Sequence, residues 1–276
     1  MAALSVPERS TLAVDPHEPI VRYEDVHKRF GAKVVLDGFT LDVMKGETLV
    51  LLGRSGIGKS VALKMLLGLL RADSGEIAVA GESIIGRSEK EMAHLRRHLG
   101  MVFQGGALFD SMTVFENIAY GLVELYRWPL DRVRRRVSDC LELVDLAGIE
   151  RLLPGALSGG MIKRVAIARA VATAPEILLY DEPTAGLDPA TTEHVNRLIV
   201  GLKQKLGVTS LVVTHDLPSA YLVADRMAVI EKGRIAWVGP TQEAKDHPPR
   251  PFERFLGHEP DPEEEEHPWK SRASSR

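Results

Sequence analysis

One octapeptide constrains the fold of this chain more than any other sequence feature: Gly53-Arg54-Ser55-Gly56-Ile57-Gly58-Lys59-Ser60. It follows the apolar run Leu49–Leu52 and opens a stretch with helical spacing, Ser60–Leu70. A GxxxxGKS pattern between a strand and a helix is a P-loop, whose glycines let backbone N–H groups face phosphates at a positively polarised helix N-terminus. In such a loop Lys59 reaches the β- and γ-phosphates, and the Ser60 hydroxyl is a ligand for Mg²⁺. The sequence therefore predicts a nucleoside triphosphate site.

Two later apolar runs end in polar residues that fit the same chemistry. Ile177–Tyr180 ends in Asp181-Glu182, and Leu211–Val213 is followed closely by His215. Short apolar runs that alternate with helices predict parallel strands buried on both faces. A carboxylate at Asp181 can hold the magnesium shell. Glu182 would then lie beside the γ-phosphate, where a carboxylate can orient and deprotonate water.

Composition and segment boundaries predict one α/β domain between two ends of different character. The chain has 276 residues and a formal net charge of −3, which argues against a general nucleic-acid binder. Residues 1–18 are predicted to be a flexible leader, 19–245 the folded domain, and 246–276 an acidic, proline-rich tail. The single cysteine, Cys140, permits no intramolecular disulfide. No window approaches the roughly 18 uninterrupted apolar residues that a membrane-spanning helix needs.

The order of motifs along the chain resembles that of one ATPase family. Gln104 and Leu157-Ser158-Gly159-Gly160 lie between the P-loop and Asp181-Glu182, and Gly186-Leu187-Asp188 and His215 follow. Over about residues 20–240 the chain resembles an ATP-binding-cassette (ABC) ATPase. The resemblance implies a P-loop NTPase core with a parallel sheet, an N-terminal antiparallel β subdomain, and an inserted α-helical subdomain at about residues 105–165. A P-loop small-molecule kinase would leave the Ser-Gly-Gly loop and the histidine without a role.

The resemblance also implies a role for individual residues. Those expected to contact the nucleotide are Phe30, Val34, Gly53, Arg54, Ser55, Gly56, Ile57, Gly58, Lys59, Ser60, Val61, Gln104, Ser158, Gly159, Gly160 and Asp188. Ser60, Gln104 and Asp181 are expected to organise Mg²⁺, Glu182 to activate water, and His215 to contact the γ-phosphate. Phe30 would stack on adenine, although an ordinary core aromatic is the alternative. Val61 stands where many of these ATPases have threonine, which removes a hydroxyl near the α-phosphate.

The family arrangement implies that this chain is half of a working unit. In that arrangement the signature loop, residues 158–160, contacts the ATP held by the P-loop of the partner subunit. Because the chain has one P-loop and one signature loop, we expect a homodimer that closes on ATP and opens after hydrolysis. With no spanning segment predicted, such a subunit would bind separate transmembrane permease subunits on the cytoplasmic side of the inner membrane. The groove around Gln104 to Asn117, with Phe109, Met112 and Phe115 as apolar anchors, is the expected contact.

In detail the chain resembles the ATPase of MCE-type phospholipid transporters, which include the maintenance-of-lipid-asymmetry system. Met161 after the Ser-Gly-Gly loop, the pair Lys163-Arg164, and the segment Pro251–Gly257 carry this resemblance. It implies an MCE-domain lipid-binding protein and a small accessory subunit in the same complex, and a C-terminal segment that docks on the partner ATPase. The alternatives are another cargo, such as an amino acid or an organic solvent, a soluble single-cassette ATPase, and a disordered acidic end.

Overall fold

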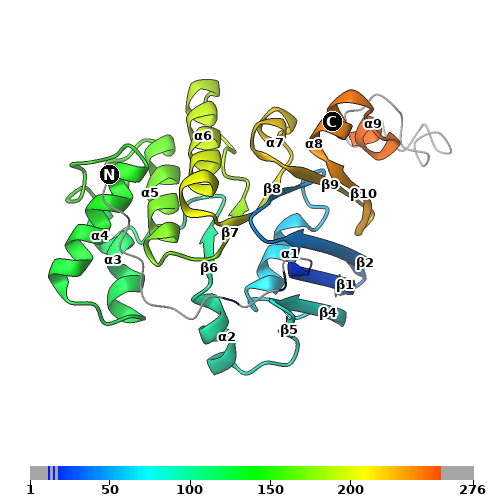
Figure 1. Ribbon diagram of the computed structural model, residues 1–276, viewed down its shortest axis with the longest axis horizontal. Coiled ribbons are helices and arrows are strands. Elements are labelled where there is room, and N and C mark those ends of the chain that lie inside the picture. The colour runs from blue at the N-terminus through cyan, green and yellow to red at the C-terminus, as the bar shows by residue number, and fades with distance from the viewer. Residues whose placement is uncertain (1–11, 13–14, 16–17, 256–276) are drawn as a thin grey trace.

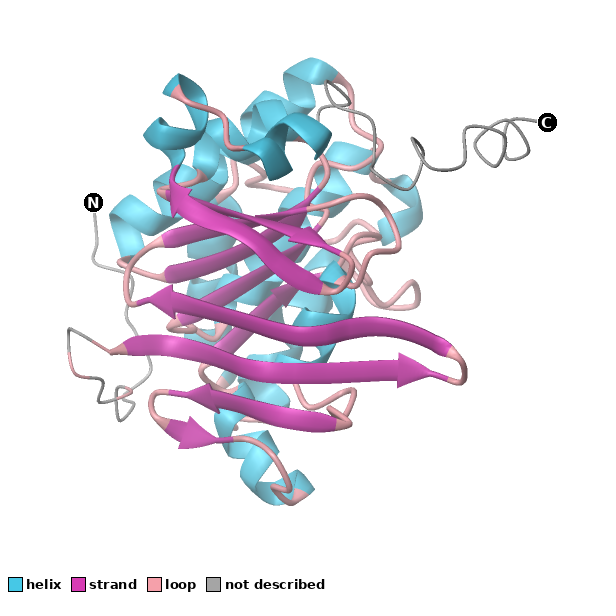
Figure 2. Cartoon of the chain, turned by 90° about the vertical axis from the view of Figure 1, so that its right-hand side faces the viewer, coloured by secondary structure: helices cyan, strands magenta, loops and turns pink. Residues whose placement is uncertain are grey.

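The structure is a computed structural model that describes residues 12, 15 and 18–255 (Figure 1). Within this part of the chain the strands form a four-stranded sheet, of order β2-β1-β4-β5, and a six-stranded sheet, of order β10-β9-β3-β8-β7-β6. The first sheet is antiparallel: β1 (Pro19–Phe30) pairs with β2 (Lys33–Met44) on one side and with β4 (Ser74–Val79) on the other, and β5 (Glu82–Ser83) extends it. The long strands are prominent in Figure 2. The predicted N-terminal antiparallel subdomain is confirmed.

The six-stranded sheet brings the chemically important loops to one edge. Its parallel strands are β3 (Thr48–Leu52), β6 (Leu99–Val102), β7 (Ile177–Asp181), β8 (Thr209–Thr214) and β9 (Arg226–Glu231), while β10 (Arg234–Pro240) pairs antiparallel with β9. Leu52 pairs with Thr214, and Asp181 pairs with Val213. The carboxyl ends of β3, β7 and β8 are therefore adjacent, as parallel strands require.

The sheet is buried on both faces, which explains why its strands are continuous apolar runs. Side chains alternate along β3, so that Val50 and Leu52 belong to one hydrophobic core and Leu49 and Leu51 to the other. The first core lies against the helical lobe and the later helices. The second lies against the antiparallel sheet and α1 (Lys59–Leu66), which ends earlier than the predicted Leu70.

The inserted helices form a lobe beside the sheet. It contains α3 (Val114–Glu124), α4 (Leu130–Leu143), the short 3₁₀ helix η1 (Pro154–Ala156) and the start of α5 (Gly159–Ala172). Figure 1 shows α3 and α4 at the far left, with α5 between them and the sheet. The remaining helices are α2 (Glu89–Arg96), α6 (Pro189–Leu206), α7 (Leu217–Val223), α8 (Thr241–Asp246) and α9 (Arg250–Phe255). In the described part no helix is long and apolar enough to cross a bilayer.

Both ends of the described chain are attached to the domain. The N–H of Leu12 donates to the two carboxylate oxygens of Glu176, at 2.9 and 3.1 Å. The other end, α9, buries the Phe252 ring completely, and this ring contacts the rings of Tyr221 and Trp237. Packed structure thus continues into the first part of the segment predicted as a tail. The rest of that segment, like most of the predicted leader, lies outside the described residues.

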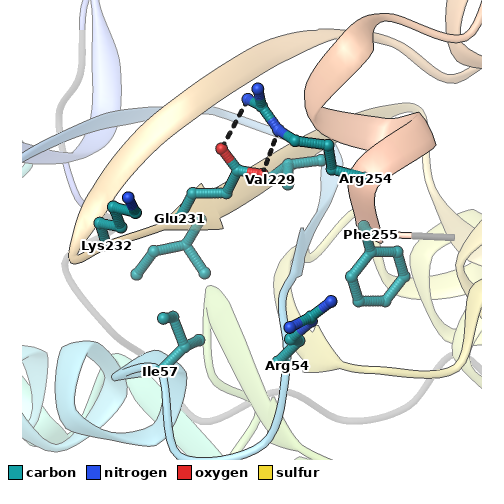
Figure 3. A pocket seen from close by; sticks show the side chains of 8 residues that line it. Arg54, Ile57, Val229, Glu231, Lys232, Arg254 and Phe255 are labelled. Atoms are coloured by element: carbon teal, nitrogen blue, oxygen red, sulfur yellow. Dashed lines mark hydrogen bonds and ion pairs between the residues drawn. The ribbon is translucent and has the colours of Figure 1, made fainter. Parts of the chain in front are cut away.

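A pocket of about 310 Å³ separates α9 from the P-loop. Figure 3 shows Arg254 of α9 clamped on the carboxylate of Glu231, with Phe255 on one wall and Arg54 and Ile57 of the P-loop opposite. The two Arg254–Glu231 hydrogen bonds measure 3.1 and 2.8 Å. Helix α9 therefore lies close to the predicted phosphate site, across a pocket that Lys59 does not line.

Candidate functional site

The P-loop connects β3 to α1, as the motif requires, and it is braced against the antiparallel sheet. Gly58 has φ 120°, and a Cβ at this position would lie 3.1 Å from the carbonyl oxygen of Val35 on β2. Lys59 is buried, and its Nζ donates to the carbonyl oxygens of Gly53 and Arg54 at 2.7 and 3.2 Å. Val61 packs partly buried against the neighbouring core. Arg54, Ser55 and Gly56 are exposed.

A hydroxyl and a carboxylate meet beside the start of α1. Ser60 Oγ donates to Asp181 Oδ1 at 2.7 Å, and Asp181 is buried at the end of β7. These are the oxygen ligands that Mg²⁺ prefers, and Mg²⁺ in such sites completes its shell with phosphate oxygens and water. No group of three or more His, Cys, Asp or Glu side chains that could hold a metal occurs among the described residues. The pair therefore fits Mg²⁺ that arrives with a nucleotide better than a resident metal.

Glu182 is the most tightly held of the predicted catalytic residues. It is 8% exposed, and its Oε2 accepts from His215 Nδ1 at 2.9 Å and from Thr214 Oγ1 at 3.1 Å. Its other oxygen lies 3.4 Å from Lys59 Nζ. Because a carboxylate can only accept, His215 Nδ1 carries the donated proton and Nε2 remains available to a ligand. Glu182, His215 and Lys59 therefore form one charged cluster, as expected for residues around a γ-phosphate.

Phe30 and Val34 are exposed at the turn between β1 and β2, by 47% and 49%. Neither side chain belongs to a core, so the alternative that Phe30 is an ordinary core aromatic is wrong. Lys28 Nζ lies 5.5 Å from the centre of the Phe30 ring. An exposed aromatic ring with an apolar neighbour suits a flat ligand such as a nucleobase.

Two residues predicted to contact the nucleotide, Ser158 of the signature loop and Asp188, are helix N-caps. Ser158 caps α5 by accepting from the N–H of Met161 at 3.3 Å, and Asp188 caps α6 by accepting from the N–H and hydroxyl of Thr191. These bonds from Thr191 lower the pKa of Asp188. Ser158, Gly159 and Asp188 are exposed, whereas a Cβ on Gly160 would lie 2.4 Å from Thr191 Cγ2. No hydrogen bond joins residues 158–160 to the P-loop in the described part of the chain.

Gln104 is exposed, and its side chain forms no hydrogen bond with Ser60 or Asp181 among the described residues. The structure thus brings together two of the three predicted Mg²⁺ ligands. Two residues of this region did not emerge as site residues from the sequence. Thr214 precedes the histidine and donates to Glu182, and buried Lys163 donates to the backbone carbonyls of Gln104 and Glu182. A buried lysine of this kind has no distinct sequence signal, because lysines are common on helix surfaces.

The fold and these clusters define a P-loop nucleotide-binding cassette. The family profile described as "ABC transporter" matches residues 36–185. The chain is 46% identical over 222 residues to the methionine import ATP-binding protein MetN of Rhizobium johnstonii, which covers 80% of this chain and 61% of that protein. It is 42% identical over 241 residues to the sulfate/thiosulfate import ATP-binding protein CysA of Methylococcus capsulatus, covering 86% and 68%.

A solved structure agrees with the sequence relatives. The ATP-binding cassette MJ0796, a dimer in a post-hydrolysis state bound to ADP and Pi, superimposes with a TM-score of 0.74 at 31% identity, covering 80% of this chain and 98% of that one. The chain spans about three fifths of the length of the MetN relatives that it matches. It belongs to the ABC transporter family.

Proposed function

We propose that this chain is the ATP-hydrolysing subunit of a membrane transporter and that Glu182 is its general base. The proposal rests on the contacts of this carboxylate. Lys59 lies beside one of its oxygens, and His215 and Thr214 donate hydrogen bonds to the other. The hydrogen-bonded pair Ser60–Asp181 lies next to it. Lys59 and the P-loop amides would bind the phosphates, and Ser60 and Asp181, joined by Gln104 from the adjoining loop, would hold Mg²⁺. Mg²⁺ would supply charge neutralisation of the phosphates.

The working unit proposed is a head-to-tail homodimer. Support comes from the exposure of Ser158 and Gly159 at a helix N-terminus, which suits a phosphate from another molecule. A groove of about 600 Å³ runs from Glu182 and His215 along Gly186 to the exposed Leu222 of α7. A second cassette seated along this groove would bring its own signature loop to the first cassette's ATP. The dimeric form of MJ0796 is consistent with this arrangement.

The permease contact proposed is a groove between the sheet and the helical lobe. It measures about 330 Å³ and is lined by residues of β6, the loop that follows it, α3 and α5. Phe109 and Tyr120 are both exposed there, with ring centres 5.1 Å apart. Phe109 therefore suits the expected anchor role, and Met112 is half-buried. Phe115 packs against the main core and is less available.

We infer phospholipid transport of MCE type as the cargo, on the residue pattern Met161, Lys163-Arg164 and Pro251–Gly257. An MCE-domain protein and a small accessory subunit would then join the permease, and the ATPase would be peripheral on the cytoplasmic face of the inner membrane. The second candidate is import of a small solute, because the relatives above are named for methionine and for sulfate or thiosulfate. Detergent extraction and affinity purification separate the two: recovery of an MCE-domain protein supports lipid cargo, and a solute-binding protein in its place supports the second.

The test of the catalytic proposal is Glu182→Gln, with Glu82→Gln as the control. Glu82 is an exposed carboxylate on β5, the end strand of the antiparallel sheet, where it pairs with Arg87. Loss of the base is expected to lower ATP turnover by at least about 100-fold. ATP should still bind, and a closed dimer should accumulate that gel filtration detects. The control variant is expected to match the natural protein. Normal turnover by Glu182→Gln would remove Glu182 from the base role.

A further inference from the structure

Lys163 is buried at the junction of three functional segments. It lies on α5 shortly after the signature loop, is 5% exposed, and donates from Nζ to the backbone carbonyls of Gln104 and Glu182, the latter at 3.2 Å. Lysine is rarely buried unless its charge is compensated. Burial lowers the pKa of Lys163, and the carboxylates of Glu182 and Asp181 oppose that shift. Burial of this ammonium group therefore costs free energy, and the formation of α5 alone does not require the side chain to be buried.

Lys163 thus links Gln104 to Glu182, and at the Glu182 end of this link the backbone has an unusual conformation. Glu182 has φ 47°, in the left-handed region that L-residues avoid. Its N–H donates to Val213 at 2.9 Å, and its carbonyl accepts from Ala185 at 3.2 Å as well as from Lys163. This peptide sets the direction in which the carboxylate leaves the end of β7. Strained conformations of this kind persist where neighbouring groups hold them, and Lys163 is one such group.

At the other end of this link, Gln104 belongs to the loop that lines the proposed permease groove. Arg169, also on α5, donates to the carbonyls of Gly106 and Ala107 in the same loop, at 2.7 and 2.6 Å. One helix thus holds this loop at two places, Gln104 through Lys163 and Gly106-Ala107 through Arg169. Lys163 is the member of the pair that also reaches Glu182.

We propose that Lys163 is a positioning residue for catalysis: its ammonium group fixes the Glu182 peptide, and with it the carboxylate, relative to the loop of Gln104 and the signature helix. The inference rests on the proposed role of Glu182 as the base. It deepens that role, because alignment of the carboxylate then depends on where the loop beside the permease groove lies. Displacement of Gln104 would loosen the support of Glu182 without touching the nucleotide-binding Lys59.

The experiment compares Lys163→Met, Lys163→Arg and Arg164→Met in the full-length chain, by steady-state ATP hydrolysis and thermal unfolding. Arg164 is a matched control, since it lies on the same helix and donates to two carbonyls, those of Val144 and Asp145, away from the charged cluster. For Lys163→Met we expect kcat to fall about 10- to 100-fold, the effect of a small misplacement of a catalytic group, while the KM for ATP changes less than about threefold. Lys163→Arg, which keeps the donors and the charge, is expected to recover part of kcat. Arg164→Met is expected to keep kcat.

Each outcome decides between defined alternatives. A kcat for Lys163→Met within about twofold of the natural value, with Glu182→Gln inactive, overturns the positioning role alone. Normal turnover by Glu182→Gln overturns the proposed function instead. An equal loss of kcat in Arg164→Met, or a loss that follows the unfolding temperature and is not recovered by arginine, assigns Lys163 to general stability and overturns the proposal. If Lys163→Met does not fold, Lys163→Gln, which keeps a shorter donor, is measured by the same criteria.

Discussion

The brace between the P-loop and the antiparallel sheet predicts that Gly58→Ala is strongly destabilising. At φ 120° and ψ 0° an L-residue is strained, and the added Cβ would lie 2.9 Å from Leu36 Cδ2 and 3.1 Å from the Val35 carbonyl oxygen. Backbone strain of this kind and overpacking each cost on the order of 1–3 kcal/mol. Because a backbone oxygen cannot rotate away, both costs apply. We expect the free energy of unfolding to fall by about 3–4 kcal/mol.

The matched control is Gly56→Ala in the same loop. Gly56 has φ 78° but no atom within 4 Å of an added Cβ, so only the left-handed conformation costs free energy, about 1–2 kcal/mol. Both variants remove the same entropy from the unfolded chain, which makes their difference the sharper quantity. The assay is urea unfolding of each variant without nucleotide, so that contacts with ATP do not enter. Equal losses of unfolding free energy for the two variants, or no loss for Gly58→Ala, would refute the close contact between the P-loop and β2.

Three further outcomes follow from the described contacts. Phe252→Ala removes a fully buried ring, so the local stability of α9 should fall by about 3–5 kcal/mol, seen as lost amide exchange protection over residues 250–255; unchanged protection contradicts the packing of α9. Burial raises the pKa of Tyr23 and Tyr180 above the ordinary 10.0. The contribution of these two residues to the free energy of unfolding is therefore fully present below pH 10 and is lost above it, as the phenols of the unfolded chain ionise. In an ultraviolet titration these two should ionise only on unfolding, and early ionisation of both in folded protein argues against their burial. Chelation of Mg²⁺ should abolish turnover while ATP still binds through Lys59, and undiminished turnover contradicts the proposed role of Ser60 and Asp181 in holding Mg²⁺.

Much of the site was accessible from the sequence because its determinants are local. The P-loop needs particular glycines beside a lysine and a serine, and a parallel strand places whatever follows it at the carboxyl edge of the sheet. Asp181 therefore reaches Ser60, and His215 reaches Glu182, from separate strands. The motif order supplied the family, and the family supplied the antiparallel sheet and the helical lobe.

The remaining features depend on contacts between distant segments that no local pattern encodes. Lys163 resembles any lysine on a helix until α5 packs against β6 and the side chain is buried. The anchoring of Leu12 on Glu176 joins residues far apart in the chain. Phe252 lies in a charged, proline-rich segment whose composition predicts a tail, but its ring packs against the rings of Tyr221 and Trp237 of the domain instead. Phe30, conversely, could have been a core residue by spacing, and only its exposure decides otherwise.

The central proposal, a catalytic site completed by a second copy of the chain, is tested most directly by mixing two inactive variants. Lys59→Ala removes the lysine proposed to bind phosphate. Gly159→Glu places a negative charge in the signature loop, where the nearest atom to an added Cβ is 3.8 Å away. Each homodimer lacks both sites, but a mixed dimer retains one intact P-loop facing one intact signature loop. At equal proportions and free exchange, about a quarter of the natural ATP turnover should return. If the mixture hydrolyses no more ATP than the separate variants, the site is not shared between copies.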